Sequence, residues 1–197
     1  MPRVTHVKSA RKANPVAEIG QPYYWWKFRH GGKRFSKTYP RPSQLTQSAY
    51  FSGIRSLVEQ IEDTEIEMGD NDAFIELRDE ITSQLRELGE EANESLQNMP
   101  EGLQQGDTGM MLEARYEACE QAADEIEYME LEGWEDYTSE KEAYLDWVAG
   151  EPDVGVDTDE YIAWQESEVD DPEETAEGWE DKASEMVDLV SSCEDCY

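Results

Sequence analysis

The most regular set of chemical groups in the sequence is a row of carboxylates between residues 113 and 127. Its members follow one another at steps of three or four residues and are Glu113, Glu117, Glu120, Asp124 and Glu127. On a helix, which rises about 1.5 Å per residue, such steps place a carboxylate about every 4.5–6 Å along one face. Like charges at this spacing repel by a few tenths of a kcal/mol per pair. The row therefore predicts a partner-binding surface that imitates nucleic-acid phosphates and engages a basic protein. In an alternative interpretation, it is a solvated acidic face that keeps a helical protein soluble.

A second group of chemically active side chains lies near the N-terminus, where aromatic and basic residues are mixed from Gln21 to Tyr39. Lysine and arginine bind phosphates, and exposed aromatic rings stack on bases. The candidate nucleic-acid-binding residues are therefore Trp25, Lys27, Arg29, Lys33, Arg34 and Lys37. In an alternative interpretation, the rings fill the core of a small sheet and the basic residues pair with acids of the same chain.

The sequence contains no recognisable catalytic motif. It has no phosphate-binding G-x-x-x-x-G-K-[ST], no G-x-S-x-G nucleophile motif and no H-E-x-x-H zinc motif. Its 48 acids produce many carboxylate pairs by chance, so the spacing of carboxylates indicates no active site. The peptide at residues 30–32, HGG, fits a hairpin turn better than an oxyanion loop. We therefore expect a protein that is not an enzyme and has no catalytic residues.

Two clusters have residue types that could form a metal or redox site. Cys193 and Cys196 form a C-x-x-C pair, but zinc requires two further ligands, and the acids around the pair disfavour a reactive thiolate. Asp153, Asp157 and Asp159 do not follow the ligand order of an EF-hand loop and are interpreted as an acidic linker. The prediction is that the protein uses no metal and no cofactor.

Charge divides the sequence into two parts. The whole chain has 48 acidic and 16 basic residues, a formal net charge of −32. Residues 1–45 contain ten of the basic residues and one acid, for a net charge of +9, whereas residues 46–197 have a net charge of −41. The acidic part should not bind nucleic acid, because such binding depends on Lys and Arg. Halophilic adaptation would spread acids over the whole surface, so the uneven distribution indicates separate electrostatic roles.

The predicted location is the cytoplasm of a bacterial or infected host cell, without membrane contact. No apolar run reaches the length of about 18 residues that a membrane-spanning helix needs, and the N-terminus lacks the pattern of a secretion signal. The three cysteines are too few for a disulfide framework.

Two strand-like runs on either side of residues 30–32 predict a β-hairpin. Alternation along the first run gives one apolar face and one face of mixed aromatic and basic character. A lone hairpin is marginally stable in water, so we expect it to pack on residues 1–20 as another strand, or on the first helix.

The segment of residues 21–39 resembles the N-terminal arm-binding modules of phage-type tyrosine recombinases. Those modules are small β-sheets with a turn similar to the GGKR of residues 31–34 and a following SKT, here residues 36–38. The resemblance covers about 20 of the 197 residues and implies a DNA-contacting hairpin. It implies no recombinase activity, because no recombinase catalytic region follows it.

Beyond residue 42 the apolar period lengthens from two residues to about 3.6, which predicts helices. Ser43 is the expected cap of the first helix, Asp70 lies in the segment that closes it and caps the second, and a third helix is expected over residues 107–133. The clearest apolar stripe belongs to the second helix and consists of Phe74, Leu77, Ile81, Leu85, Leu88, Ala92, Leu96 and Met99.

Residues 132–197 are expected to form three shorter helices. Ser139 and Glu142 form a capping-box pattern for the first, Thr158 precedes the second, and Asp171 marks the start of the third.

The five-residue sequence EGWED occurs twice, at residues 132–136 and 177–181. Two copies are fewer than the three or so that a stable repeat array needs. The pattern is interpreted as coincidence or a local duplication, with paired helical units as an alternative.

Together these features predict a mainly α protein, with a small basic N-terminal β-hairpin or sheet followed by an acidic multi-helix domain. The expected segments are a basic aromatic module at 1–42, a helical bundle at 43–131 and Trp-containing short helices at 132–197. The expected function is that of a non-enzymatic interaction protein, an inhibitor or nucleic-acid mimic of phage or bacterial type that binds a basic, nucleic-acid-binding protein. One alternative is a nucleic-acid-binding accessory or regulatory protein that uses the hairpin, and another is a helical structural or assembly scaffold.

Overall fold

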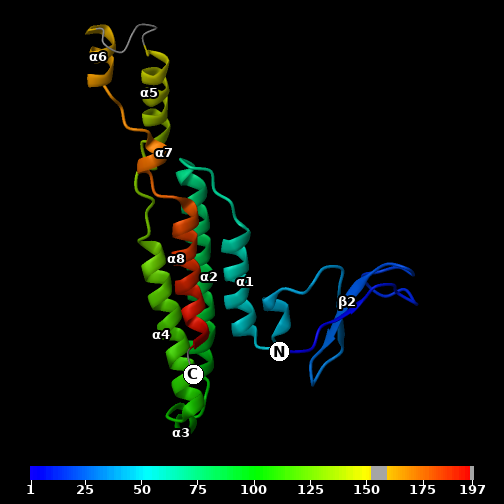
Figure 1. Cartoon of the computed structure of the whole chain (residues 1–197). Helices are drawn as coiled ribbons and strands as arrows, with labels where there is room; N and C mark the ends of the chain where they lie inside the picture. The colour runs from blue at the N-terminus through cyan, green and yellow to red at the C-terminus, as the bar shows by residue number, and fades with distance from the viewer. Residues whose placement is uncertain (152–158, 196–197) are drawn as a thin grey trace.

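The protein is an elongated arrangement of helices with a small β-sheet to one side, in a computed structural model that describes residues 1–151 and 159–195 (Figure 1). The predicted fold class is confirmed, because the chain is mainly α and the sheet is formed near its N-terminus. The elements follow in the order β1 (Thr5–Val7), β2 (Tyr23–Lys27), β3 (Lys33–Ser36), η1 (Pro42–Leu45), α1 (Ala49–Asp63), α2 (Asn71–Gln97), α3 (Glu101–Gln104), α4 (Asp107–Glu127), α5 (Tyr137–Ala149), α6 (Asp159–Glu166), α7 (Pro172–Thr175), α8 (Trp179–Ser192) and η2 (Cys193–Asp195).

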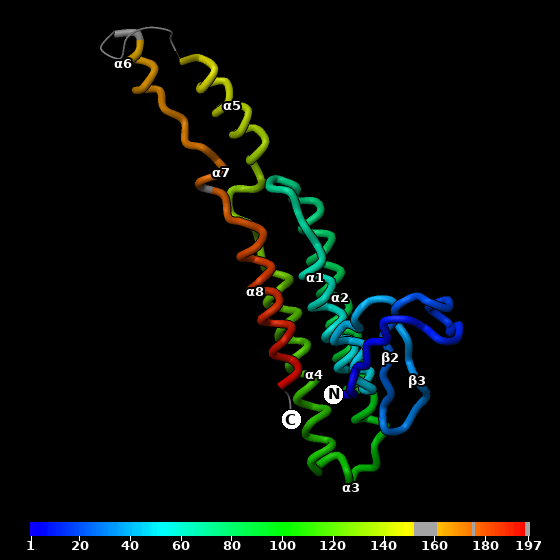
Figure 2. The backbone as a smooth tube through the Cα atoms, turned by 45° about the vertical axis from the view of Figure 1, so that its right-hand side comes forward, coloured from blue at the N-terminus to red at the C-terminus, as the bar shows by residue number. Residues whose placement is uncertain are grey.

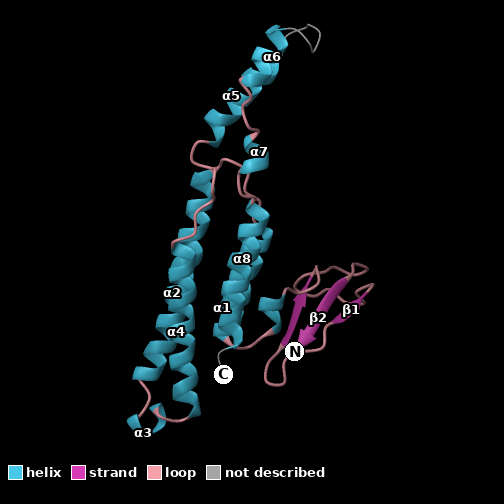
Figure 3. Ribbon diagram, turned by 60° about the vertical axis from the view of Figure 1, so that its left-hand side comes forward, coloured by secondary structure: helices cyan, strands magenta, loops and turns pink. Residues whose placement is uncertain are grey.

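The sheet has three antiparallel strands in the order β1-β2-β3 and lies beside the helices (Figure 3). β2 and β3 form the predicted hairpin, and β1 is the additional strand expected from the N-terminal segment. The register pairs Trp25 with Thr5 and Phe35, and it pairs Trp26 with Arg34. Trp26 is only 3% exposed, whereas Trp25, on the opposite face, is half-buried. The rest of the chain therefore covers the face that carries Trp26 at this residue, whereas Arg34, its partner in the register, is exposed.

The first long helix starts later than predicted. Residues Pro42–Leu45 form a short 3-10 helix, and α1 begins directly after Ser48, whose hydroxyl accepts a hydrogen bond from a backbone N–H of the first turn. Ser43, the predicted cap, instead donates from its backbone N–H and its hydroxyl to the carboxylate of Glu59, both at 2.8 Å. These contacts hold Ser43 against the side of α1 rather than at its start.

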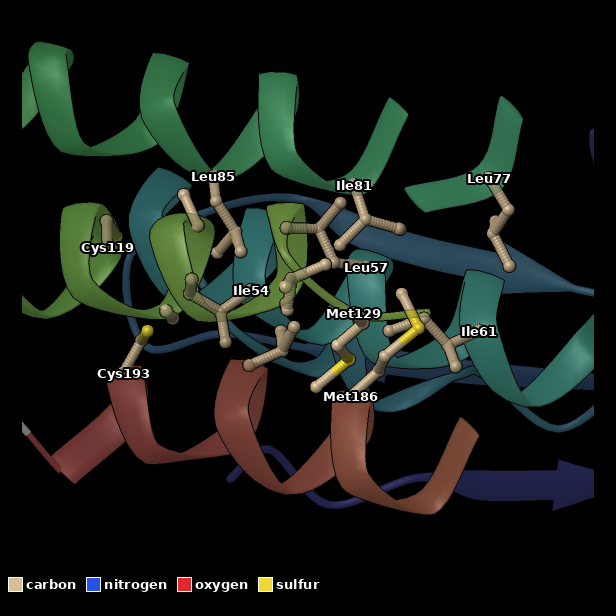
Figure 4. Packing of buried hydrophobic residues seen from close by; sticks show 14 of the residues in the cluster. Ile54, Leu57, Ile61, Leu77, Ile81, Leu85, Cys119, Met129, Met186 and Cys193 are labelled. Atoms are coloured by element: carbon tan, nitrogen blue, oxygen red, sulfur yellow. The ribbon is translucent and has the colours of Figure 1, made fainter. Parts of the chain in front are cut away.

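The hydrophobic core lies between α1, α2, α4 and α8, whose apolar side chains point toward one another in Figure 4. Five of the eight residues in the predicted α2 stripe are buried, and the other three are half-buried. The core cluster includes Ile54, Leu57 and Ile61 of α1, Phe74, Leu77, Ile81 and Leu85 of α2, Cys119, Ala123 and Ile126 of α4, and Met186 and Val190 of α8. Helices from the predicted segments 43–131 and 132–197 therefore share one core.

α2 and α4 run antiparallel and pack closely along most of their length (Figure 1). Gly89 permits the close approach, because a Cβ added there would lie 3.1 Å from the Cβ of Cys119. At the other end of the contact, the Arg78 guanidinium donates to the carbonyl oxygen of Met129 at 3.3 Å. These contacts set the register between the two helices.

α5, α6 and α7 form an arm that extends beyond the end of the packed helices (Figure 2). The rings of Trp147 and Trp164 stack with centroids 4.4 Å apart, and each indole N–H donates to the backbone carbonyl of the other residue. The predicted capping box is not formed, because Ser139 lies inside α5, where its hydroxyl donates to the carbonyl of Asp136. Thr158, predicted to precede the next helix, lies outside the described residues.

The two copies of EGWED lie side by side at the base of the arm. The Glu177 N–H donates to the Glu132 carbonyl at 3.0 Å, and the indole N–H of Trp134 donates to the Glu177 carbonyl at 2.8 Å. The two motifs thus form the crossing at which the chain leaves the packed helices and returns to them. Extended backbone at Ala176 and Gly178 serves this crossing and divides the last predicted helix into α7 and α8.

Replacing Ile81 with Ala should lower the free energy of unfolding by about 2–5 kcal/mol, because Ile81 is fully buried and its truncation leaves a cavity. Urea denaturation followed by far-UV circular dichroism measures this change. Ile162→Ala is the matched control, because Ile162 is 44% exposed, and it should change the free energy by less than about 1 kcal/mol. Equal losses in the two variants would contradict the placement of the core.

Candidate interaction surfaces

α4 carries the five acids predicted to bind a partner, and we call them the acidic face: Glu113, Glu117, Glu120, Asp124 and Glu127. All are exposed except Glu120, which is half-buried. Arg86 of α2 donates hydrogen bonds to the carboxylates of Glu127 and Asp124, which raise the pKa of Arg86 above its ordinary value. No cation in the described part of the chain forms an ion pair with the other three acids. The unpaired negative charge of the acidic face therefore lies toward the N-terminal half of α4.

Two acids of α2 extend the acidic face across the seam between the helices. Because Gly89 lies against Cys119 and the helices run antiparallel, the register sets Glu90 and Glu94 beside the first three acids of the acidic face. Both glutamates are exposed. We did not predict them, because their place beside α4 depends on the interhelical register. The sequence feature that could have identified these two glutamates is their position on the polar side of the α2 stripe.

Each of the six basic side chains of the helical body, residues 46–197, lies against a group of the same body. Five form ion pairs, and the guanidinium of Arg115 lies over the ring of Tyr50, 4.5 Å from its centroid. The ion pairs join Arg55 with Glu194, Arg78 with Asp79, Arg86 with Asp124 and Glu127, Lys141 with Asp171 and Glu173, and Lys182 with Glu177 and Glu185. Because the cations are used internally, carboxylates dominate the charge that the body presents to a partner.

The face of the sheet opposite Trp26 joins rings and ammonium groups, and we call it the aromatic-basic face: Tyr23, Trp25, Lys27, Lys33 and Phe35. The Lys33 ammonium lies 4.3 Å from the centroid of the Trp25 ring. Tyr23 and Phe35 contact each other, with ring centroids 6.0 Å apart. Lys27 and Lys33 are exposed, and the three rings are half-buried. The structure thus brings Trp25, Lys27 and Lys33 together on one surface, as stacking and phosphate contacts require.

The other three candidate nucleic-acid-binding residues lie off this face. Arg34 pairs with Trp26 in the register, so it belongs to the opposite face, where its guanidinium is 5.2 Å from the centroid of the Phe28 ring. Arg29 lies in the turn between β2 and β3, and Lys37 follows β3. All three are exposed and lie around the aromatic-basic face rather than within it.

Few polar contacts join the basic N-terminal module, residues 1–42, to the helical body. Arg41 forms an ion pair with Asp63, and the Gln47 amide donates to the carbonyl of His30 at 2.9 Å. Among the described residues, no acid pairs with the candidate nucleic-acid-binding residues Lys27, Arg29, Lys33, Arg34 and Lys37. The ion pairs expected from the alternative interpretation are therefore not made by these side chains.

No family model, curated protein or solved structure matches the chain. The resemblance of residues 21–39 to recombinase arm modules stays a prediction from the sequence. Within residues 1–151 and 159–195, no helix combines the length and the apolar character needed to cross a membrane. In the same ranges, no three His, Cys, Asp or Glu side chains are grouped so that they could hold a metal ion.

Cys193 packs in the core rather than at a surface site. It is fully buried, its thiol donates to the carbonyl of Ala118 at 3.5 Å, and its own carbonyl accepts a hydrogen bond from the Tyr50 hydroxyl at 3.0 Å. Cys196, the other member of the C-x-x-C pair, lies outside the described residues, as do Asp153 and Asp157.

Raising the NaCl concentration from 0.02 to 0.3 M should raise the midpoint of thermal unfolding by about 5 °C or more. The salt shortens the Debye length from about 20 Å to below 10 Å and weakens the repulsion among the acids of the helical body. Circular dichroism during heating measures the midpoint. The variant Arg86→Gln, which removes an internal cation, should depend more steeply on salt, and a midpoint that falls with added salt would contradict this electrostatic account.

Proposed function

We propose that the protein is a non-enzymatic interaction protein of phage or bacterial type, whose acidic helical body binds a basic, nucleic-acid-binding protein as an inhibitor or nucleic-acid mimic. The observation that carries the proposal is the exposure of Glu113, Glu117, Glu90 and Glu94 at the α2–α4 seam while the cations of the body are used internally. A surface of this kind attracts a cationic partner over long range and supports fast, salt-sensitive association.

The arrangement of the acids supports the mimicry. Carboxylates recur about every 4.5–6 Å along α4, and the acids of α2 add a second row beside them. A DNA strand carries one phosphate per about 3.4 Å of helix axis. Lysine and arginine side chains that line a phosphate-binding groove can therefore reach several carboxylates of these two rows at once.

The compartment that we propose is the cytoplasm of a bacterial or infected host cell, where nucleic-acid-binding partners are abundant. The free, buried thiol of Cys119 suits a reducing compartment. Association alone, with no chemical step, is sufficient for the proposed inhibition.

Affinity capture with the tagged full-length chain tests the proposal. Lysate from the native cell is treated with nuclease and passed over the protein at 0.1 M and at 0.5 M salt, and retained proteins are identified by mass. We expect a basic, nucleic-acid-binding protein that is retained at low salt, is released at high salt and is displaced by added DNA. Capture that disappears after nuclease treatment would contradict direct binding by the acidic body.

Neutralising three acids of the acidic face together, Glu113→Gln, Glu117→Gln and Glu120→Gln, should raise the Kd for the captured partner about tenfold at 0.1 M salt, because complementary charges are lost. Isothermal titration calorimetry measures the Kd. The matched control replaces three glutamates of the arm, Glu140, Glu142 and Glu166, by Gln, and should change the Kd less than about twofold. Equal effects of the two triple variants would remove the acidic face as the binding site.

A second candidate function, in which the sheet contacts nucleic acid, is favoured by the aromatic-basic face. Trp25, Lys27 and Lys33 share one face, and no acid of the described residues forms an ion pair with the two lysines. The resemblance of residues 21–39 to recombinase arm modules points in the same direction. In this function, the protein is an accessory or regulatory factor that holds nucleic acid with its sheet and a basic protein with its helices.

The full-length chain should then shift labelled DNA or RNA in a gel at low salt. The double variant Lys27→Gln/Lys33→Gln should weaken binding about tenfold and lower the slope of log K against log salt by about two, because each lysine that contacts a phosphate adds about one to this slope. Lys8→Gln/Lys12→Gln makes the same change in charge at exposed lysines outside the strands and is the control. Absence of any shift with the unmodified protein would exclude this second function.

A further inference from the structure

A cavity of about 760 Å³ opens where the end of α1, the connection from α1 to α2 and the start of α8 meet. Its apolar lining combines buried Ile61, Trp134 and Trp179 with half-buried Ile66 and Met68. Its rim carries the exposed acids Glu62, Glu65, Glu67, Glu180 and Asp181. We call this cavity the EGW groove, because the tryptophans of both EGWED copies line it.

The two tryptophans of the EGW groove are held in place before any ligand binds. The indole N–H of Trp134 donates to the carbonyl of Glu177 at 2.8 Å, and that of Trp179 donates to the carbonyl of Thr64 at 3.0 Å. Trp179 also makes an edge-on contact with Phe74, with ring centroids 6.3 Å apart. Because both N–H groups are satisfied within the protein and both rings are buried, the two indoles form a fixed part of the lining, and the apolar surface that a ligand can reach belongs mainly to half-buried Ile66 and Met68. A lining that is ordered in advance lowers the entropic cost of binding.

Nearby cations of the same chain are directed away from the rim of the EGW groove. Lys182 pairs with Glu177 and Glu185, and Arg41 pairs with Asp63. Within the described residues, none of the five rim acids forms an ion pair. The rim therefore keeps its negative charge for a group that comes from outside the chain.

An apolar groove with an acidic rim selects a ligand that is apolar at its centre and cationic at its ends. A ligand without charge would leave the rim carboxylates uncompensated, and an acidic ligand would be repelled. We propose that the EGW groove binds a short basic segment of the partner protein, with an aliphatic side chain against Ile66 and Met68, beside the buried tryptophans, and Lys or Arg side chains at the rim. This inference rests on the proposed function, because it gives the basic partner a specific anchoring point on the helical body.

The first test is the binding of the peptide Ac-GRKLLKRG-NH2 to the full-length protein at 0.15 M salt. Labelling with ¹⁵N-indole tryptophan makes the groove visible by NMR, and the variants Trp134→Phe and Trp179→Phe identify the two resonances. We expect saturable shifts of these two indole signals. A peptide in which serine replaces both leucines should bind at least about tenfold more weakly, because it keeps the charge but loses the apolar contact.

Variants of the protein locate the peptide. Ile66→Lys should weaken binding about tenfold, whereas Ile162→Lys, the same change at an exposed isoleucine of the arm, should alter it less than about twofold. The double variant Glu65→Gln/Glu67→Gln changes only exposed rim acids, so it provides the test if Ile66→Lys does not fold, and it should also weaken binding. Its control, Glu140→Gln/Glu142→Gln, removes the same charge from exposed positions of the arm.

Equal affinity of the leucine and serine peptides, or equal effects of groove and control variants, would overturn the proposal. It would also be overturned by a dimer in sedimentation equilibrium that Ile66→Lys dissociates, because a second copy would then occupy the EGW groove. Failure of the proposed function is a separate result, namely that no basic partner is captured from the native cell. Capture that depends on the acidic face but not on Ile66 would overturn the groove inference alone.

Discussion

Electrostatic self-repulsion is the constraint under which the helical body folds, because residues 46–197 carry a net charge of −41. The shared core of α1, α2, α4 and α8 supplies the apolar burial that opposes it. The few cations stand at the seams between elements, where one charge contacts acids that would otherwise repel each other. Arg55 joins α1 to η2, Arg86 joins α2 to α4, and Lys141 joins α5 to the start of α7. Negative charge on the outer surfaces is therefore a consequence of how the body is held together.

The regular elements followed from the sequence wherever local pattern decided the structure. The steps of three and four residues along α2 predicted its buried side, and Asp70 caps it as expected. Predictions were wrong where a distant contact decided instead. Ser43 fits a helix cap by its type, yet Glu59 binds it from the side of α1. The break between α7 and α8 depends on the crossing of two segments that are 45 residues apart in the sequence. Local helix propensity therefore could not predict this break.

The candidate surfaces were predictable to a similar degree. Helical spacing along one element identified the acidic face, and strand alternation was sufficient to set Trp25 and Lys27 on one face. The rest depended on the register between elements. This register divides the acidic face at Arg86, adds Glu90 to it, and places Arg34 on the face of the sheet opposite Trp25. The EGW groove was hidden for the same reason, because its lining comes from segments far apart in the sequence. The repeated EGWED motif was the one feature of the sequence that pointed to this groove.

The crossing at Glu132 and Glu177 also defines the arm as a topological insertion, with its entry and exit points joined by a backbone hydrogen bond. The four packed helices are complete without the inserted segment, because α8 begins near the end of α4 and runs back alongside it (Figure 2). An insertion with adjacent ends can lengthen, shorten or be exchanged without disturbing the path of the host helices. A change in the length of the arm should therefore leave the host helices in place, while the tryptophans at its base remain tied to the fold.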